Sequence, residues 1–414
     1  MSTALALPRG VLLTLLAACG ARTDLSTSRA SDAGASTGGT CQGDALVLAA
    51  SSTVDAPQMD SEPESAPRLA WTGSELLVAW TRWTPDPYFY VVDPIHLYPD
   101  HLDVAPETTI GVGNSSNPFI LSTVWDGSTL ALFWAQDDGS ILLQHFGPDG
   151  ATTGAMAKIV VAPTNSQTIP SDVIALGGGY LFTWFVQSST GWQTFAGPFT
   201  HDGAPTATQT LLYAGGGYDY GAQLATMGGS VFALWSMNPA NMPMTPVDTV
   251  VVSLDPATGA VRTMSTVDQG VDYDPASLAT EPRAGRLDIA TWLPDTSSAL
   301  LLGGSVGGPF VTRATIDGAT SAPSIAVDDC GRLVVLTPRG QMTPDNPLPT
   351  GLTLQLVAGD GTLGPAVTLP VGSSYLETYD LVAVAGGFAV GWVEGGAASS
   401  SPGRSLHVAF VRVQ

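Results

Sequence analysis

The residues best suited to chemistry are acidic and aromatic side chains that stand together just before apolar runs of the chain. They are Tyr218, Asp219, Tyr220, Asp272, Tyr273, Asp274, Tyr379 and Asp380, and Asp172 stands at the equivalent place in a further segment. Carboxylates beside phenol rings can bind a cation, a sugar or a basic peptide. Two carboxylates about 5–10 Å apart could instead hydrolyse a glycosidic bond. The alternative is that each aspartate caps the backbone of a tight turn where a strand begins.

Aromatic residues in a long connection form a second candidate contact surface. Trp83 and Tyr88 flank the Pro-rich segment 84–87. Exposed aromatic residues suit an adaptable binding surface. The alternative is that this segment folds over the adjacent strands as a local lid.

Motifs that specify a reaction are missing from the sequence. It contains no HExxH motif and no P-loop, no GxSxG nucleophile elbow between a strand and a helix, no GxGxxG within a βαβ unit, and no D-x-D-x-D-G calcium loop. Neither the arginine cluster nor the S-x-D-x-G-x-T-W box of sialidases is visible. The five histidines are scattered, and the three cysteines include no CxxC pair, so we expect neither a metal site nor a cofactor.

A repeated unit of two apolar strands must position these candidates. The first strand is short, a Gly-containing turn follows, and the second strand is apolar on both of its alternating faces and usually ends in Trp. The copies are 67–80, 120–134, 172–184, 222–235, 276–292, 323–336 and 380–392. Their last residues are Trp80, Trp134, Trp184, Trp235, Trp292, Leu336 and Trp392, spaced 44 to 57 residues apart. A period near 50 residues is typical of propeller blades.

A second hairpin follows most copies, as in 141–154 and 250–263, which gives four strands per repeat. The seventh copy has only three strands, because the chain ends after the strand at 405–413. The segment 45–50 can supply the missing strand and close the ring. We therefore predict an all-β, seven-bladed β-propeller of four-stranded antiparallel blades over 44–414, closed by pairing of its N-terminal strand with the C-terminal blade.

The repeat resembles a pattern of secreted bacterial proteins, P-x-hydrophobic-A-x-D-G-x-x-hydrophobic-x-x-W. The resemblance covers about 370 residues, and Leu336 departs from it. It implies a fold and no particular chemistry. In such a propeller, the connections before the first strand and after the second strand of each blade share the top face, where ligands usually bind. The two other connections share the bottom face.

The N-terminus carries an export signal. Arg9 precedes the apolar run 11–18, which is too short to span a membrane. The run ends Leu16-Ala17-Ala18-Cys19, which resembles the bacterial lipoprotein signal; an ordinary signal peptide is the alternative. The resemblance implies that 1–18 is removed, that Cys19 carries acyl chains and that 19–43 is a flexible tether. Gly20, where enteric bacteria use Asp for retention at the inner membrane, implies the outer membrane.

The two remaining cysteines are expected to form a disulfide. Cys41 precedes the closing strand, and Cys330 lies in a bottom-face turn of the neighbouring sixth blade. An exported location is oxidising. The alternative is two free thiols, if the two Cα atoms lie more than about 7 Å apart.

The charge narrows the range of partners. The formal net charge is −22, from 36 acidic and 14 basic residues, which argues against nucleic-acid binding. We therefore expect a monomeric cell-envelope lipoprotein that touches the membrane only through its lipid. Its top face would act as a non-enzymatic scaffold for a protein, glycan or cell-wall component. The alternatives are a polysaccharide hydrolase or lyase using top-face carboxylates, and a structural lipoprotein without a specific ligand.

Overall fold

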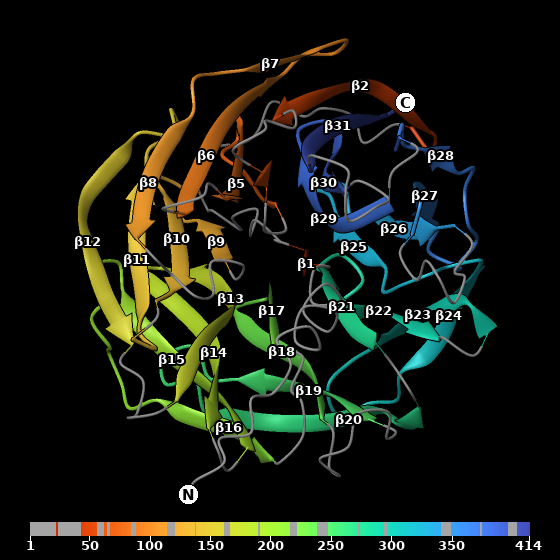
Figure 1. The fold of residues 1–414 in the computed structure, drawn as a ribbon. Helices are drawn as coiled ribbons and strands as arrows, with labels where there is room; N and C mark the ends of the chain where they lie inside the picture. Colours follow the sequence, from red (N-terminus) through yellow and green to blue (C-terminus); the bar gives the residue numbers. More distant parts are fainter. Residues whose placement is uncertain are drawn as a thin grey trace, which may run out of the picture.

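The computed structural model is an all-β ring of seven sheets around a central axis (Figure 1). It describes residues 22–23, 43–55, 62–63, 67–83, 88–113, 121–136, 138–160, 166–188, 191–215, 222–237, 247–271, 274–293, 296–340, 349–372, 375–395 and 404–414. The predicted seven-bladed propeller of four-stranded antiparallel blades is confirmed. No helix in this described part of the chain is long and apolar enough to cross a membrane.

Each blade runs from an innermost strand at the axis to an outer strand at the rim. The innermost strands, blades one to seven, are β4 (Arg68–Trp71), β9 (Leu121–Trp125), β13 (Gln167–Leu176), β17 (Gln223–Met227), β21 (Asp274–Glu281), β25 (Ser324–Val327) and β29 (Tyr375–Val384). The second strands are β5 (Leu76–Trp83), β10 (Leu130–Ala135), β14 (Gly179–Ser188), β18 (Ser230–Met237), β22 (Arg286–Leu293), β26 (Leu333–Arg339) and β30 (Gly387–Gly395).

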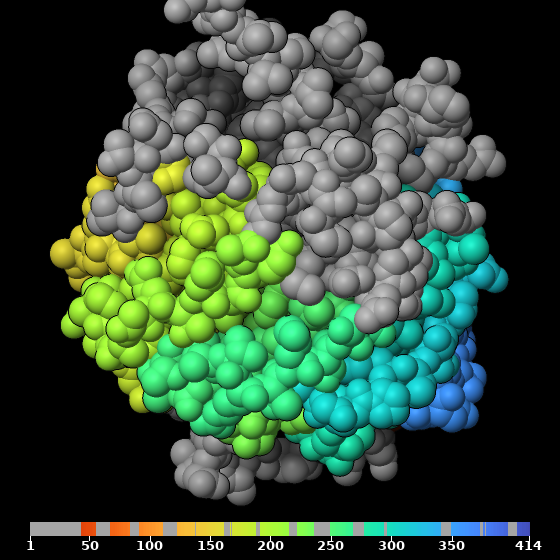
Figure 2. Space-filling model, turned by 90° about the horizontal axis from the view of Figure 1, so that it is seen from below, coloured from red at the N-terminus to blue at the C-terminus, as the bar shows by residue number. Residues whose placement is uncertain are grey.

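The outer half of each blade is formed by a third and a fourth strand. The third strands are β6 (Tyr88–Leu97), β11 (Ile141–Phe146), β15 (Gly191–Thr200), β19 (Val247–Leu254), β23 (Ser298–Gly304), β27 (Gly351–Val357) and β31 (Ser405–Val413). The fourth strands are β7 (Leu102–Val104) with β8 (Thr108–Gly113), β12 (Thr152–Val160), β16 (Thr210–Gly215), β20 (Val261–Val271), β24 (Val311–Asp317), β28 (Val367–Thr368) and β2 (Leu46–Asp55). Viewed from the side, blades three to six form a continuous outer wall in sequence order (Figure 2).

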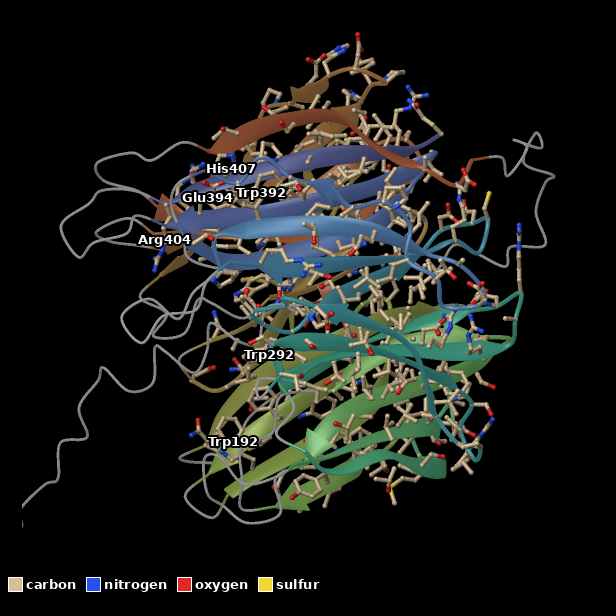
Figure 3. The ribbon with its side chains drawn as sticks, turned by 90° about the vertical axis from the view of Figure 1, so that its right-hand side faces the viewer. Trp192, Trp292, Trp392, Glu394, Arg404 and His407 are labelled. Atoms are coloured by element: carbon tan, nitrogen blue, oxygen red, sulfur yellow. The ribbon has the colours of Figure 1, made fainter. Side chains whose placement is uncertain are left out.

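Apolar side chains on both faces of the inner strands hold the blades together. All six residues of β10 are buried, whereas the outer strand β12 exposes most of its residues. Seven hydrophobic clusters fill the seven junctions between adjacent blades. The second strands continue one to four residues past the tryptophans of the repeat, which are buried within these clusters, and Leu336 takes this place in blade six. Trp292 and Trp392 lie toward the same face of the ring (Figure 3).

The ring closes as predicted. β2 pairs antiparallel with β31, with Leu46 opposite Val413, so the first described long strand completes the last blade. Leu46 packs into the cluster between blades six and seven, while Ala49 of the same strand packs toward blade one.

A short strand within the predicted tether was not expected. β1 (Arg22–Thr23) pairs parallel with the innermost strand β29 of blade seven and lies at the centre of the ring (Figure 1). A further short strand, β3 (Glu62–Pro63), pairs with β5 of blade one. Apart from Gly43, the rest of the tether and the signal segment, including Cys19, lie outside the described residues.

Candidate metal centre

Two predicted rim carboxylates, Asp172 and Asp380, lie between the blades instead of on the rim. Asp380 is 0 % exposed, and its two oxygens accept the backbone N–H groups of Leu69 in blade one (2.8 Å) and of Leu381 (2.9 Å). Asp172 likewise accepts the N–H groups of Leu224 in blade four (2.7 Å) and of Val173 (2.8 Å). Both carboxylates therefore connect innermost strands of adjacent blades, which corrects their expected place at the top mouth.

The same type of connection recurs around the axis with other polar residues. Gln223 accepts the N–H of Leu278, and Ser277 accepts the N–H of Ile325. Tyr379 also bonds the preceding blade: it is 6 % exposed, and its hydroxyl donates to the carbonyl of Ala322. These residues fasten blades three to seven to one another in turn and blade seven to blade one, so the acid-and-tyrosine pattern at 379–380 has a structural function.

The other predicted top-face residues are not characterised by the structure. Tyr218, Asp219, Tyr220, Asp272 and Tyr273 lie outside the described residues. Asp274, Trp83 and Tyr88 belong to strands β21, β5 and β6, but their side chains lie outside the described part. The expected aromatic and acidic rim at these positions stays a prediction.

Cys330 is disulfide-bonded. The other two cysteines of the chain, Cys19 and Cys41, lie outside the described residues, so the pairing of Cys41 with Cys330 stays a prediction. Nearby contacts fit it: Arg332 donates to the carbonyl of Gly43 (3.4 Å).

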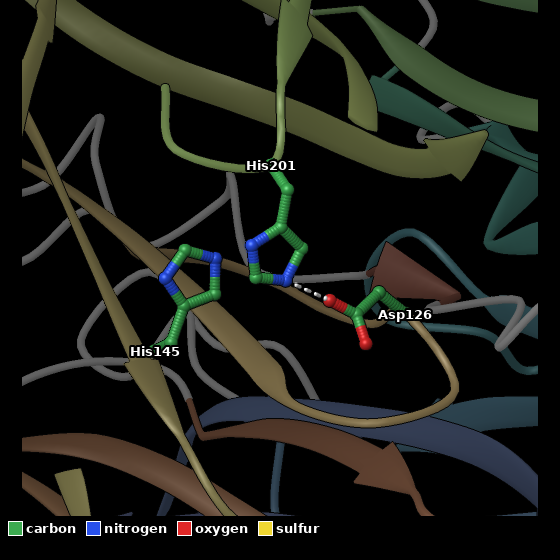
Figure 4. A group of neighbouring side chains, drawn as sticks. All are labelled: Asp126, His145 and His201. Atoms are coloured by element: carbon green, nitrogen blue, oxygen red, sulfur yellow. Dashed lines mark hydrogen bonds and ion pairs between the residues drawn. The ribbon is translucent and has the colours of Figure 1, made fainter. Parts of the chain in front are cut away.

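A cluster that the sequence did not reveal lies on the bottom face, at the junction of blades two and three. Asp126, His145 and His201 each place one ligand atom so that all three atoms lie within 4.8 Å of one another. Figure 4 shows the three side chains converging from separate segments. Asp126 follows β9, His145 is in β11, and His201 follows β15, so two blades supply the cluster.

The Asp126 carboxylate is the centre of this cluster. Its Oδ1 accepts the backbone N–H groups of Ser128 (2.8 Å) and Thr129 (2.7 Å) and the Ser128 hydroxyl (2.8 Å). Its Oδ2 accepts the hydroxyls of Thr129 (2.9 Å) and Tyr180 (3.0 Å) and lies 2.7 Å from Nε2 of His201. A carboxylate offers about four lone-pair positions. Six polar groups therefore compete for about four acceptor positions on this carboxylate.

Tyr180 joins the second histidine to this carboxylate. Its hydroxyl lies 2.9 Å from Nε2 of His145. The single phenol hydrogen is donated to Asp126, so Nε2 of His145 must carry a hydrogen and donate to the Tyr180 oxygen. The rings of His145 and His201 stack with centroids 4.2 Å apart. The four atoms His145 Nε2, Tyr180 Oη, Asp126 Oδ2 and His201 Nε2 therefore form one continuous chain.

Burial and hydrogen bonding set the protonation of these groups. Burial opposes ionisation of Asp126, but bonds from the backbone N–H groups of Thr129 and Ser128 outweigh it and hold the pKa of this carboxyl well below its ordinary value. Burial, together with the neighbouring His201, lowers the pKa of His145. Burial and the charge of Asp126 raise the pKa of Tyr180. Near neutral pH the cluster thus offers an ionised carboxylate and a neutral imidazole, the forms that bind metal ions.

Glycines allow the two turns to bring their side chains to the junction. Gly127 follows Asp126 with φ +98°, a conformation that favours glycine. Gly203 has φ +83°, and a Cβ there would lie 2.4 Å from Cγ2 of Ile159 in blade two. The turn that carries His201 thereby packs directly against the neighbouring blade.

No family model matches the chain, and no curated protein matches it. Solved structures do resemble its fold. The subtype N11 neuraminidase-like protein of the strain A/flat-faced bat/Peru (H18N11) has a TM-score of 0.51 and 10 % identity, over 89 % of this chain and 94 % of that one. An oligogalacturonate lyase in complex with manganese has a TM-score of 0.50 and 9 % identity, over 90 % and 98 %. At such identities the likeness shows the propeller fold alone.

The cluster has the composition of a transition-metal site. Two imidazoles and one carboxylate form the set that binds zinc and non-haem iron, with positions left for further ligands. Donors bound at about 2.0–2.1 Å in neighbouring octahedral positions lie about 2.9 Å apart. The separations along the chain of four atoms are 2.9, 3.0 and 2.7 Å. A metal ion could therefore replace the shared hydrogens with small movements of the side chains.

Proposed function

We propose that this protein is a non-enzymatic binding protein of the cell envelope whose ligand is a first-row transition metal ion. The carrying observation is the convergence of Asp126, His145 and His201 at the junction of two blades. Three segments that are separated in the sequence meet there, and one carboxylate is surrounded by donors from blade two and from blade three.

The chemistry of the donors favours a transition metal over calcium or magnesium. Calcium and magnesium prefer oxygen ligands, whereas imidazole nitrogen suits zinc, copper, iron and nickel. The side chain of His201 is 45 % exposed, which gives an ion access from solvent. The net charge of −22 raises the concentration of cations around the protein.

Catalysis by top-face carboxylates has less support. Asp172 and Asp380, two of the acids that could have served a hydrolase or lyase, are occupied by backbone N–H groups of adjacent blades. A binding function requires no such acid pair. The protein, glycan or cell-wall partner expected at the top face remains a separate proposal.

Stoichiometric binding of Zn²⁺ or Co²⁺ tests the metal site. Isothermal titration of the purified, metal-free protein should show one ion bound per chain. His145→Ala should weaken binding by more than about 100-fold, because loss of a ligand costs more than loss of its supporting contacts. His96→Ala removes a half-exposed histidine of β6 and should change the affinity less than about threefold.

Two outcomes would count against the metal site. One is the absence of one-to-one binding in the unaltered protein. The other is an affinity that Asp126→Asn and His145→Ala both leave unchanged, since those variants remove the charge and a nitrogen ligand. Asp149→Asn, in an exposed turn of the same blade, controls for the lost acidic charge.

The envelope location depends on lipidation of Cys19. In a bacterial host supplied with labelled palmitate, the unaltered chain should carry label and sediment with membranes. Cys19→Ser should carry none and remain in the soluble fraction, because an export signal without acyl chains gives no stable anchor. Equal labelling of both proteins would contradict the proposal.

A further inference from the structure

The phenol oxygen of Tyr180 lies within the proposed metal site and not merely beside it. It is 3.0 Å from Oδ2 of Asp126 and 2.9 Å from Nε2 of His145, so it contacts two of the three proposed ligands. Tyr180 is 1 % exposed, and its ring packs edge-on against Phe133 with centroids 5.5 Å apart. The side chain is therefore held in place by the core while its oxygen faces the ligand atoms.

We propose that Tyr180 is a fourth ligand and that the site is built for ferric iron. This inference rests on the proposed metal site and assigns its preferred ion. When iron binds, the O–H bond of Tyr180 breaks, an iron–oxygen bond forms, and the proton leaves to solvent. The hydrogen that Nε2 of His145 donates to Tyr180 in the metal-free protein moves to Nδ1 by exchange with solvent, so both histidines bind as neutral imidazoles with Nε2 free for the metal.

Charge explains why a trivalent ion suits this set. A carboxylate and a phenolate together bring two negative charges into a partly buried site, and two imidazoles bring none. A trivalent cation offsets this charge better than a divalent one, because the interaction grows with the product of the charges and is strengthened by burial. Without the ion, the phenol keeps its proton and donates it to Asp126.

The residues around Tyr180 also favour a phenolate that is bound to a metal ion over one that is free. Thr129 donates its hydroxyl to Oδ2 of Asp126, which Tyr180 also contacts, and lies 3.4 Å from Nε2 of His201, so it holds these two ligands relative to each other. In the part of the chain that the structure describes, Asp126, His145 and His201 are the group of at least three His, Cys, Asp or Glu residues that could hold a metal ion. The phenol at their centre adds a donor of a type that zinc sites rarely use.

Visible spectroscopy on the full-length protein tests this inference. Fe³⁺, supplied as its nitrilotriacetate complex, should give a coloured protein with one iron per chain, because phenolate-to-iron charge transfer absorbs visible light. Resonance Raman excitation in that band should enhance phenolate ring vibrations. Tyr180→Phe should remove the colour and weaken Fe³⁺ binding by more than about 100-fold, yet change Zn²⁺ affinity less than about tenfold. Tyr98→Phe, at an exposed tyrosine of blade one, should leave both unchanged.

The outcomes separate this inference from the proposed function. Zn²⁺ binding without a coloured Fe³⁺ complex would overturn the assignment of Tyr180 and leave the metal site standing. A band whose enhanced vibrations are not those of a phenolate would do the same, whatever the stability of the Tyr180→Phe variant. Failure of every ion to bind would overturn both.

Discussion

Replacing Leu46 by aspartate should lower the free energy of unfolding by about 4 kcal/mol or more, since it places a charge in the cluster that closes the ring. Leu46 is 8 % exposed and packs between blades six and seven from the strand that joins the two ends of the chain. Loss of that strand would leave the edge of β31 open to water and to other chains. Chemical denaturation and size-exclusion chromatography should show an earlier transition and aggregated protein.

The adjacent residue provides a matched control. Val47 lies on the same strand but is 40 % exposed, because successive side chains of a strand point to opposite faces. Val47→Asp should shift the unfolding midpoint by less than the equivalent of about 0.5 kcal/mol. Equal effects of the two substitutions would show that β2 does not hold the ring closed through its inward face.

Replacing Asp380 by alanine should cost about 3 kcal/mol of stability. Its carboxylate accepts two buried backbone N–H groups, one of them Leu69 in blade one, and each buried donor left without an acceptor costs about 1–3 kcal/mol. The substitution would loosen the junction of blades seven and one at the axis. Urea denaturation should show a lower midpoint for Asp380→Ala, and a similar loss for Asp172→Ala.

Asp103→Ala controls for removal of an acidic charge, because Asp103 is an exposed residue of the outer strand β7. It should leave the midpoint close to that of the unaltered protein. If Asp380→Ala is equally mild and instead abolishes binding of a glycan or peptide, the carboxylate is a ligand-binding group and not a connection between blades.

The fold could be predicted because the information for it is local and repeated. Each copy carries an apolar strand, a glycine turn and a strand that is apolar on both faces, as in 130–135. Counting strands also identified the partner of the segment 405–413. The interruption of the outer strand of blade one into β7 and β8 was not foreseen, since no repeated feature marks it.

The candidate site could not be predicted with the same ease because its residues are distant in sequence. Asp126 and His145 are 19 residues apart, and His201 follows 56 residues after His145. A signal did exist: Asp126-Gly127 and the turn at 201–203 both belong to bottom-face connections of successive blades. Asp126 and His201 therefore share one face of the ring, as Cys41 and Cys330 were predicted to do.

For the acidic segments, the sequence identified the residues but not the role of their carboxylates. Asp172 and Asp380 were expected either to line the top mouth or to cap a turn, and sequence alone does not distinguish an exposed carboxylate from one that accepts backbone hydrogens. The structure shows the second kind of role, with the acceptor reaching across to the next blade. Such long-range hydrogen bonds depend on the distance between strands that only the folded ring defines.

An anomalous difference map tests the central claim most directly. Crystals of the protein grown with one equivalent of Zn²⁺ would be measured at wavelengths on both sides of the zinc absorption edge. We predict one strong peak within about 2.0–2.2 Å of a carboxylate oxygen of Asp126, of Nε2 of His145 and of Nε2 of His201. A map without a peak at this junction, in crystals that contain zinc at other histidines such as His96, would contradict the account.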